Sequence, residues 1–171
     1  MAALVIEPMR PDDWPAVAAI YGEGIATGVA TFDTVVPDWA AWDSSHRPDC
    51  RLVARVNGAV AGFVALTPYS SRSVYAGVAW ESVYVAVDRR GEGIGRALLS
   101  AVVEASEAVG VWTLLAGIQA ENTASVALHE RAGFRRVGVQ ERVGRDAGGV
   151  WRDVILMERR SATVMAPAPA D

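Results

Sequence analysis

Apolar residues change their spacing between residues 83 and 105, and the change divides this stretch into three elements. Residues 83–87 form a continuous apolar run, which is typical of a buried strand. From residue 94 onward the apolar positions recur every three or four residues, as on one face of a helix, at Ile94, Ala97, Leu98, Ala101, Val102 and Ala105. Glycines occupy every second position between the two parts, at Gly91, Gly93 and Gly95. The pattern predicts a strand, a glycine-rich turn and a helix in direct succession.

Turn and cap residues mark further strands and helices along the rest of the chain. Asn57-Gly58 lies between two apolar runs and predicts a tight hairpin. Asn122 and Gly133 carry the residue types that begin and end a short helix. The expected strands cover residues 4–6, 51–56, 60–66, 75–87, 111–118, 134–139 and 150–157, and the expected helices begin near Pro11, Pro37, Ile94 and Asn122.

Length and composition favour one folded domain. The chain has 171 residues, of which 51% are hydrophobic and 21% are charged. We expect a single domain over residues 1–160 and a disordered, Ala/Pro-rich tail over residues 161–171. With no basic and apolar leader and no apolar run of roughly 18 residues, the sequence predicts a soluble, cytoplasmic protein that does not bind membranes.

The net charge and the small number of cysteines and histidines argue against several classes of function. The net charge of −4 argues against a general nucleic-acid surface, although it leaves room for a local basic patch. One cysteine and two histidines predict no metal site and no internal disulfide. We expect Cys50 to be a small core residue at the start of a strand rather than a catalytic thiol.

The glycine-rich turn has the chemistry of a phosphate site. A helix begins with unpaired N–H groups and a positive dipole end, and glycines before it let a ligand approach the backbone. Arg89, Arg90 and Arg96 add positive charge. The turn lacks the Gly-Lys-Ser/Thr ending of a P-loop, and Leu98 stands where a third Rossmann glycine would follow Gly93 and Gly95. A glycine-rich βα turn without a ligand is the alternative interpretation.

The segment Arg90-Gly91-Glu92-Gly93-Ile94-Gly95 matches a pattern of Arg/Gln-x-x-Gly-x-Gly between a strand and a helix, and so resembles the acetyl-CoA pyrophosphate loop of the GNAT superfamily of N-acetyltransferases. Two later segments, residues 122–134 and the Gly-x-Trp-x-Asp-Val of residues 149–154, resemble phosphinothricin acetyltransferase-like members. The resemblance spans about residues 6–159. It implies an α/β, α+β mixed GNAT fold: a mostly antiparallel, twisted sheet of about six to seven strands, about four flanking helices, and a splayed strand pair that binds coenzyme A.

The resemblance also implies a binding site for acetyl-CoA. The strand residues Val83, Tyr84 and Val85 would hold the pantetheine arm, and Asn122 would bind its thioester end or serve only as a helix cap. The pyrophosphate would lie on the turn and the first helical residues, namely Arg90, Gly91, Glu92, Gly93, Ile94, Gly95 and Arg96.

The expected catalytic residues are Glu81 and His129. The related enzymes place a glutamate base where an ungapped alignment puts Trp80, so Glu81 comes one residue late. A shift of one residue in a strand reverses the face on which a side chain lies, and a β-bulge near residues 79–81 would restore it. Without a bulge, Glu81 would point away, Trp80 would line the acceptor pocket, and water relayed to His129 or to a backbone carbonyl would be the base. An imidazole at His129 can protonate the departing thiolate or only fill a helix face.

The acceptor side is expected to include Phe32, Arg72, Tyr75 and Trp80. Arg72 would pair with an acceptor carboxylate or phosphinate, or be a solvated loop arginine, and the aromatic residues would be pocket walls or core. The hypothesis is an acetyl-CoA-dependent N-acetyltransferase for a small amino-acid-like substrate such as phosphinothricin, methionine sulfoximine or methionine sulfone. The alternatives are another amine acceptor (a protein N-terminus, a polyamine or an aminoglycoside) and a non-catalytic CoA-binding regulatory domain. A homodimer is compatible with the resemblance.

Overall fold

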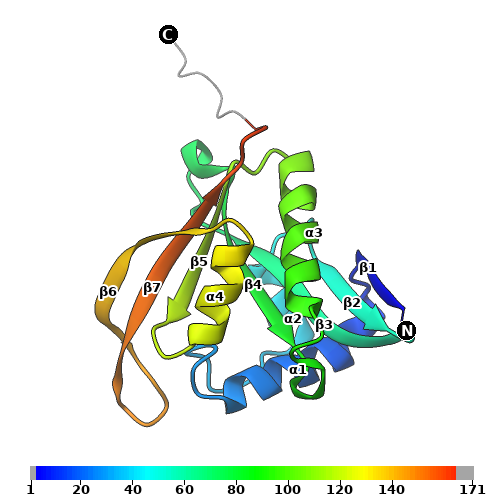
Figure 1. Cartoon of the computed structure of the whole chain (residues 1–171), viewed down its shortest axis with the longest axis horizontal. Coiled ribbons are helices and arrows are strands. Elements are labelled where there is room, and N and C mark those ends of the chain that lie inside the picture. Colours follow the sequence, from blue (N-terminus) through cyan, green and yellow to red (C-terminus); the bar gives the residue numbers. More distant parts are fainter. Residues whose placement is uncertain (1–2, 165–171) are drawn as a thin grey trace.

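The computed structural model describes residues 3–164, and its centre is one seven-stranded sheet with the order β1-β2-β3-β4-β5-β7-β6 (Figure 1). Every neighbouring pair is antiparallel except β4 and β5, which are parallel. The strands are β1 Leu4–Pro8, β2 Leu52–Val56, β3 Ala59–Pro68, β4 Val78–Val85, β5 Thr113–Gln119, β6 Arg135–Arg145 and β7 Trp151–Arg160. The α-helices are α1 Trp14–Ala26, α2 Trp39–Ser45, α3 Ile94–Ala108 and α4 Thr123–Arg131. This is the mixed, mostly antiparallel sheet with four helices that was predicted.

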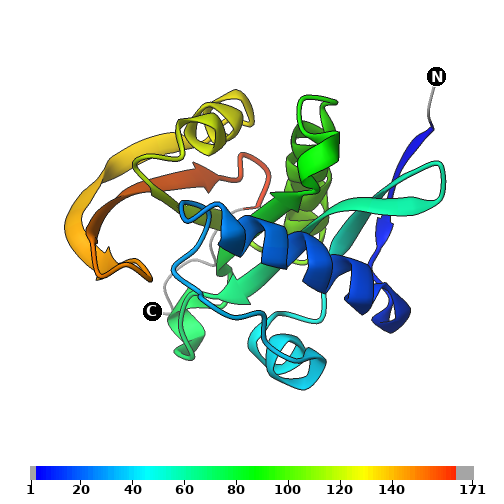
Figure 2. The same cartoon turned by 90° about the horizontal axis from the view of Figure 1, so that it is seen from below.

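The sheet separates two hydrophobic cores. Figure 2 shows α3 and α4 on one face and α1 and α2 on the other. Side chains alternate accordingly along β3, where Val64 and Leu66 pack under α3 while Phe63 and Ala65 pack against the α1 side. The alternation of β4 continues it, with Val83 on the α3 side and Tyr84 on the α1 side. Two covered faces explain why the central strands read as continuous apolar runs.

Local signals decide most element boundaries. Asn57 and Gly58 form the predicted hairpin turn, with φ angles of 51° and 86° that suit a type I′ turn. The strand expected from residue 75 begins only at Val78, because Ser73–Tyr75 forms a short 3-10 helix. At the other end, β6 extends to Arg145, well beyond the expected residue 139. Nearly all of β6 is exposed, so burial imposes no alternation that the sequence could reveal.

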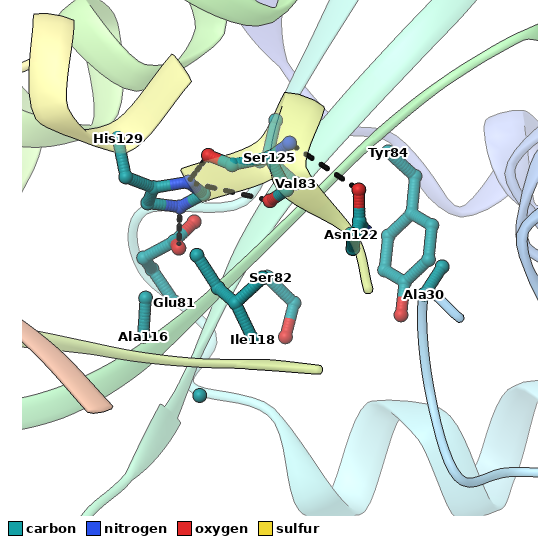
Figure 3. A pocket seen from close by; sticks show the side chains of 11 residues that line it. Ala30, Glu81, Ser82, Val83, Tyr84, Ala116, Ile118, Asn122, Ser125 and His129 are labelled. Carbon is teal, nitrogen blue, oxygen red and sulfur yellow. Dashed lines mark hydrogen bonds and ion pairs between the residues drawn. The ribbon is translucent and has the colours of Figure 1, made fainter. Parts of the chain in front are cut away.

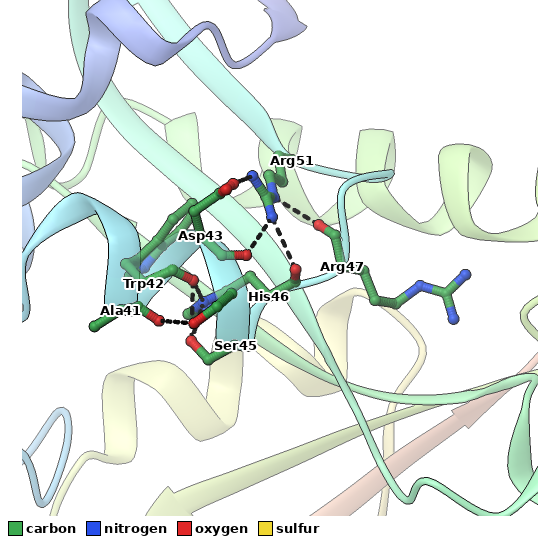
Figure 4. A network of polar contacts seen from close by, with 8 residues as sticks. Ala41, Trp42, Asp43, Ser45, His46, Arg47 and Arg51 are labelled. Atoms are coloured by element: carbon green, nitrogen blue, oxygen red, sulfur yellow. Dashed lines mark hydrogen bonds and ion pairs between the residues drawn. The ribbon is translucent and has the colours of Figure 1, made fainter.

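A polar network fixes the segment between α2 and β2 (Figure 4). The Asp38 carboxylate caps α2 by accepting the Ala41 N–H at 2.8 Å. The Arg51 guanidinium donates to the backbone carbonyls of Asp43, His46 and Arg47 at 2.6–2.9 Å. The chain that leaves α2 is therefore tied to the first residue before β2.

Cys50 is buried in the core beside the start of β2, as predicted. Burial raises the pKa of its thiol to about 11, which leaves it protonated at neutral pH. The predicted tail begins at Ser161, whose N–H donates to the Trp112 carbonyl at 2.9 Å; residues 165–171 lie outside the described residues. Within residues 3–164, no helix is long and apolar enough to cross a bilayer, and no three metal-ligating side chains gather at one point.

Candidate active site

The parallel strands β4 and β5 diverge in the middle of the sheet. Val78, Ala79 and Trp80 pair with residues 113–115, and the described parts of the two strands make no further pairing. Beyond Trp80, a cavity of about 70 Å³ opens between them (Figure 3). Its walls come from both strands, from the loop after α1 and from α4 with its cap: Ala30, Glu81, Ser82, Val83, Tyr84, Ala116, Gly117, Ile118, Asn122, Ser125 and His129. The predicted splay is therefore present.

Glu81 reaches this cavity without a bulge. Residues 79–85 of β4 pair one for one with residues 62–68 of β3, so the expected alternative of a bulge near residues 79–81 is wrong. Glu81 lies on the same face as Ala79 and Val83, beneath α4, and Trp80 lies on the opposite face. The expectation that an unbulged Glu81 would point away from the cavity is also wrong, because the gap between the strands opens on the α4 side as well.

Glu81 and His129 form a buried hydrogen-bonded pair. Glu81 Oε1 lies 2.5 Å from His129 Nε2, and the two side chains are only 2% and 3% exposed. His129 Nδ1 donates to the Ser125 carbonyl oxygen at 2.7 Å, so both ring nitrogens have partners. Figure 3 shows the imidazole between the Ser125 carbonyl and the Glu81 carboxyl group. One proton is therefore held between Nε2 and Oε1, and the two groups act as one unit.

The surroundings of the pair bias its protonation. Burial alone would lower the pKa of His129, but the hydrogen bond and charge of Glu81, together with the Ser125 carbonyl, raise the pKa above its ordinary value. Glu81 Oε2 is buried and has no hydrogen-bond partner among the described residues. That oxygen is the free acceptor of the pair.

The glycine-rich turn ends against α4 and the end of β4. Gly91 and Gly93 have φ angles of 85° and 83°, which a residue with a side chain rarely adopts. The first bond of α3 runs from the Ala97 N–H to the Gly93 carbonyl at 3.1 Å, so the three preceding N–H groups of residues 94–96 have no partner within the helix. Gly95 lets α4 approach closely, because a Cβ there would lie 3.0 Å from Leu128. The turn thus presents N–H donors at the open end of β4.

Asn122 caps α4 at the edge of the cavity. Its side-chain oxygen caps α4 by accepting the Ser125 N–H at 3.2 Å, and its amide nitrogen donates to the Val29 carbonyl at 3.5 Å. It also lines the cavity.

A second cavity, of about 490 Å³, lies between α3, α4 and the end of β7. Arg96, Arg131, Arg159 and Arg160 line it, and Arg159 is paired with Glu107 at 3.1 Å. Sequence reasoning assigned Arg96 to the phosphate turn and missed the other three.

The expected acceptor residues Phe32, Arg72, Tyr75 and Trp80 are not among the residues that line the 70 Å³ cavity, and they form two separate groups. Tyr75 and Trp80 lie together with Tyr69, which sequence reasoning missed, with ring centres of Tyr69 at 5.1 Å and 6.1 Å from theirs. The Arg72 guanidinium lies over the Tyr75 ring at 5.7 Å. Phe32 belongs to the loop after α1 and packs against Gly144 of β6.

Comparison with known proteins decides the family. Residues 16–134 match the model of the "Acetyltransferase (GNAT) family". The chain belongs to the GNAT family. It is similar to the phosphinothricin N-acetyltransferase of Alcaligenes faecalis, with 38% identity over 168 residues that cover 92% of this chain and 82% of the relative. It is also similar to an L-methionine sulfoximine/L-methionine sulfone acetyltransferase of Pseudomonas aeruginosa, with 32% identity over 85% of this chain and 88% of the relative.

A solved GNAT structure supports the same assignment. The crystal structure of a phosphinothricin acetyltransferase from Sinorhizobium meliloti in complex with acetyl-CoA superposes with a TM-score of 0.87 and 29% identity, covering 98% of this chain and 94% of that one. The predicted family, GNAT fold and enzyme class, an N-acetyltransferase, are therefore confirmed. The roles of individual site residues stay predictions.

Proposed function

We propose that this GNAT domain, over residues 1–160, transfers the acetyl group of acetyl-CoA to the amino group of a small amino-acid-like acceptor. Phosphinothricin, methionine sulfoximine and methionine sulfone are the acceptors of choice, because the relatives of the preceding section act on them. The observation that carries the proposal is the buried Glu81–His129 pair, which lines the cavity between the two splayed strands.

The chain's own groups fit acetyl-CoA, which supplies a thioester as the acyl donor. On the side that faces β5, the backbone of β4 at Val83, Tyr84 and Val85 has no strand partner among the described residues and is available to the pantetheine amides. The N–H groups of residues 94–96, with Arg90 and Arg96, suit a pyrophosphate. The arginine-lined cavity at Arg131 suits the remaining phosphate of coenzyme A.

The Glu81–His129 pair supplies the proton transfers. An amino group is protonated at neutral pH and must lose a proton before it can attack a thioester. Glu81 Oε2 is the free acceptor for that proton, directly or through one water, while His129 holds Oε1. The same unit then returns a proton to the departing sulfur. In the proposed reaction the N–H near Val83 stabilises the charge that develops on the thioester oxygen.

The acceptor binds on the side of Trp80 and Phe32. Arg72 pairs with its carboxylate or phosphinate group; a guanidinium stacked on Tyr75 still has its N–H donors available at the ring edge. Trp80, Tyr75 and Phe32 form the walls. The side chain of Tyr69 extends the same aromatic surface.

A homodimer through β6 agrees with the exposed surface. The strand lies at the edge of the sheet, and Val137, Val139 and Val143 on it are 45–59% exposed, with Trp151 of β7 nearby at 51%. An exposed, eleven-residue edge strand is a template for pairing with another chain. We also assign the reaction to the cytoplasm, because acetyl-CoA is an intracellular metabolite.

The test is the release of free CoA thiol from acetyl-CoA across an acceptor panel. The panel contains phosphinothricin, methionine sulfoximine, methionine sulfone, small amino acids, spermidine, an aminoglycoside and a peptide with a free N-terminus. We expect turnover with the amino-acid analogues and mono-acetylated products by mass spectrometry. Turnover restricted to the cationic acceptors or the peptide would overturn the acceptor assignment. Thermal stabilisation by CoA with no turnover of any acceptor would favour a binding module instead.

A separate experiment tests whether the arginine-lined cavity binds the additional phosphate of coenzyme A. Arg131→Ala should raise the KM for acetyl-CoA and leave the KM for dephospho-CoA thioesters nearly unchanged, because only the former carries the additional phosphate. An equal change for both donors would contradict this placement.

A further inference from the structure

The loop of residues 27–34 closes one side of the cavity and is attached to the sheet. Ala30 on this loop lines the cavity. The Gln119 amide donates to the Thr31 carbonyl at 3.1 Å, and the Tyr21 hydroxyl donates to the Asp33 carboxylate. With the bond from Asn122 to Val29, the loop is held from α1, β5 and α4. Its position relative to the cavity is therefore fixed.

Phe32 extends from this loop onto Gly144 of β6. A Cβ built at Gly144 would lie 2.7, 2.8 and 3.1 Å from three atoms of the Phe32 ring. Gly144 does not have a positive φ, so a side chain is compatible with its backbone and only the ring opposes it. The ring thus occupies the space of the missing Cβ.

An irregularity in β6 brings Gly144 to this position. The pairing of β6 with β7 shifts register between Gln140 and Gly144. Within the irregular part, Arg142 has a φ of 51°, and its N–H donates to the Asp153 carboxylate at 2.8 Å. Asp153 belongs to the Gly-x-Trp-x-Asp-Val segment, and this bond gives its carboxylate a position-holding role.

We propose that Gly144 is a specificity-determining position for the acceptor, acting through Phe32. The inference rests on the proposed function, in which Phe32 is a wall of the acceptor site. Because residue 144 has no side chain, the Phe32 ring lies directly against β6. A methyl group at residue 144 displaces the nearest ring atom from 2.7 Å to at least the 3.4 Å of ordinary contact. Since the loop is attached at both ends of this segment, the ring moves and narrows the acceptor site.

The test is Gly144→Ala, with Gly138→Ala as the matched control. Gly138 lies in the same strand, also without a positive φ, and a Cβ there meets nothing within 4 Å. For Gly144→Ala we expect the KM of the largest accepted amino acid to rise roughly tenfold, as a misfit of one methylene does. The KM of the smallest acceptor should change less, and the KM of acetyl-CoA should stay within about twofold. Gly138→Ala should match the wild type in all three.

A second substitution separates this effect from general damage. Phe32→Leu removes the clashing ring atoms, so the Gly144→Ala/Phe32→Leu double variant should regain the larger acceptor. If Gly144→Ala does not fold, the double variant should fold, and failure of both would overturn the proposal. A Gly144→Ala enzyme with an unchanged acceptor profile, or with an equal rise in the KM of acetyl-CoA, would also overturn it.

The outcome is distinguishable from failure of the proposed function. If the wild type turns over no amino-acid acceptor, the proposed function fails before the variants are compared. The contact between Phe32 and residue 144 is then tested by the free energy of unfolding. Gly144→Ala should be less stable than Gly138→Ala, and Phe32→Leu should restore its stability. Light scattering on each variant checks that the oligomeric state is unchanged, because both glycines lie on the edge strand.

Discussion

Glu81 and His129 form a buried pair, and replacing one of them should cost a different amount of stability from replacing the other. The side chains lie 2.5 Å apart and are 2–3% exposed. Glu81→Gln leaves an imidazole, which at pH 7 becomes neutral at almost no cost because its ordinary pKa is about 6.5. The cost is then that of a lost charged hydrogen bond, about 1–3 kcal/mol.

His129→Leu leaves a buried carboxylate without its partner. To become neutral at pH 7 the carboxyl group must take up a proton against an ordinary pKa of about 4.3, which costs about 3.7 kcal/mol. Remaining charged and unpaired costs about 3–5 kcal/mol. His129→Leu should therefore lower the free energy of unfolding by about 4 kcal/mol, roughly 2 kcal/mol more than Glu81→Gln.

Urea unfolding at two pH values measures this asymmetry. In the His129→Leu protein the buried carboxyl group can become neutral only by taking up a proton, so stability is lost as the pH rises and regained as it falls. Between pH 7 and pH 5.5 the cost of protonating the carboxyl group falls by about 2 kcal/mol, while keeping the imidazole of Glu81→Gln neutral becomes about 1 kcal/mol more costly, so the difference seen at pH 7 should disappear or reverse. The Glu81→Gln/His129→Leu double variant should be more stable at pH 7 than His129→Leu alone. Equal costs at pH 7, with no change at pH 5.5, would refute a buried and coupled pair.

Two further predictions concern the pH dependence of wild-type stability and the packing of Gly77, just before β4. Because the pKa of His129 is raised, the stability that this pair contributes is fully present below about pH 6.5 and is lost as the pH rises through the folded pKa. As the pH rises from about 6.5 through the folded pKa, the melting temperature should fall in the wild type and fall less in Glu81→Gln. A calorimetric pH series measures both. Gly77→Ala should destabilise the protein by about 1–3 kcal/mol or more in urea unfolding, since its Cβ would lie 1.9 Å from the Trp112 ring, and a cost equal to that of Gly138→Ala would contradict this packing.

The fold follows from local patterns that the sequence displays openly. Helical spacing from Ile94, the Asn-Gly turn at residue 57 and the cap at Asn122 each act within a few residues, so they can be recognised without the tertiary structure. The boundaries of β6 could not be predicted in this way. An exposed edge strand has no buried face, and its irregularity depends on a contact with Asp153 eleven residues away.

Only part of the site could be predicted, because some of its contacts join segments that are far apart in the sequence. The one-residue offset between Trp80 and Glu81 could not be decided from strand periodicity, because periodicity tells which side chains share a face and not on which face a gap opens. The structure places Glu81 beneath α4, where His129 meets it across 48 residues of sequence. The arginine cavity and the Phe32–Gly144 contact join distant segments in the same manner, and no motif marks them.

In the proposed reaction Glu81 accepts the proton of the acceptor's amino group. The kcat of Glu81→Gln beside the wild type tests this role, with the best amino-acid acceptor and saturating acetyl-CoA. We expect a loss of at least about 100-fold in kcat, the size of a general-base contribution, with the KM of acetyl-CoA and the thermal stabilisation by CoA retained. A Glu81→Gln enzyme with nearly wild-type kcat would contradict the claim and place the base elsewhere.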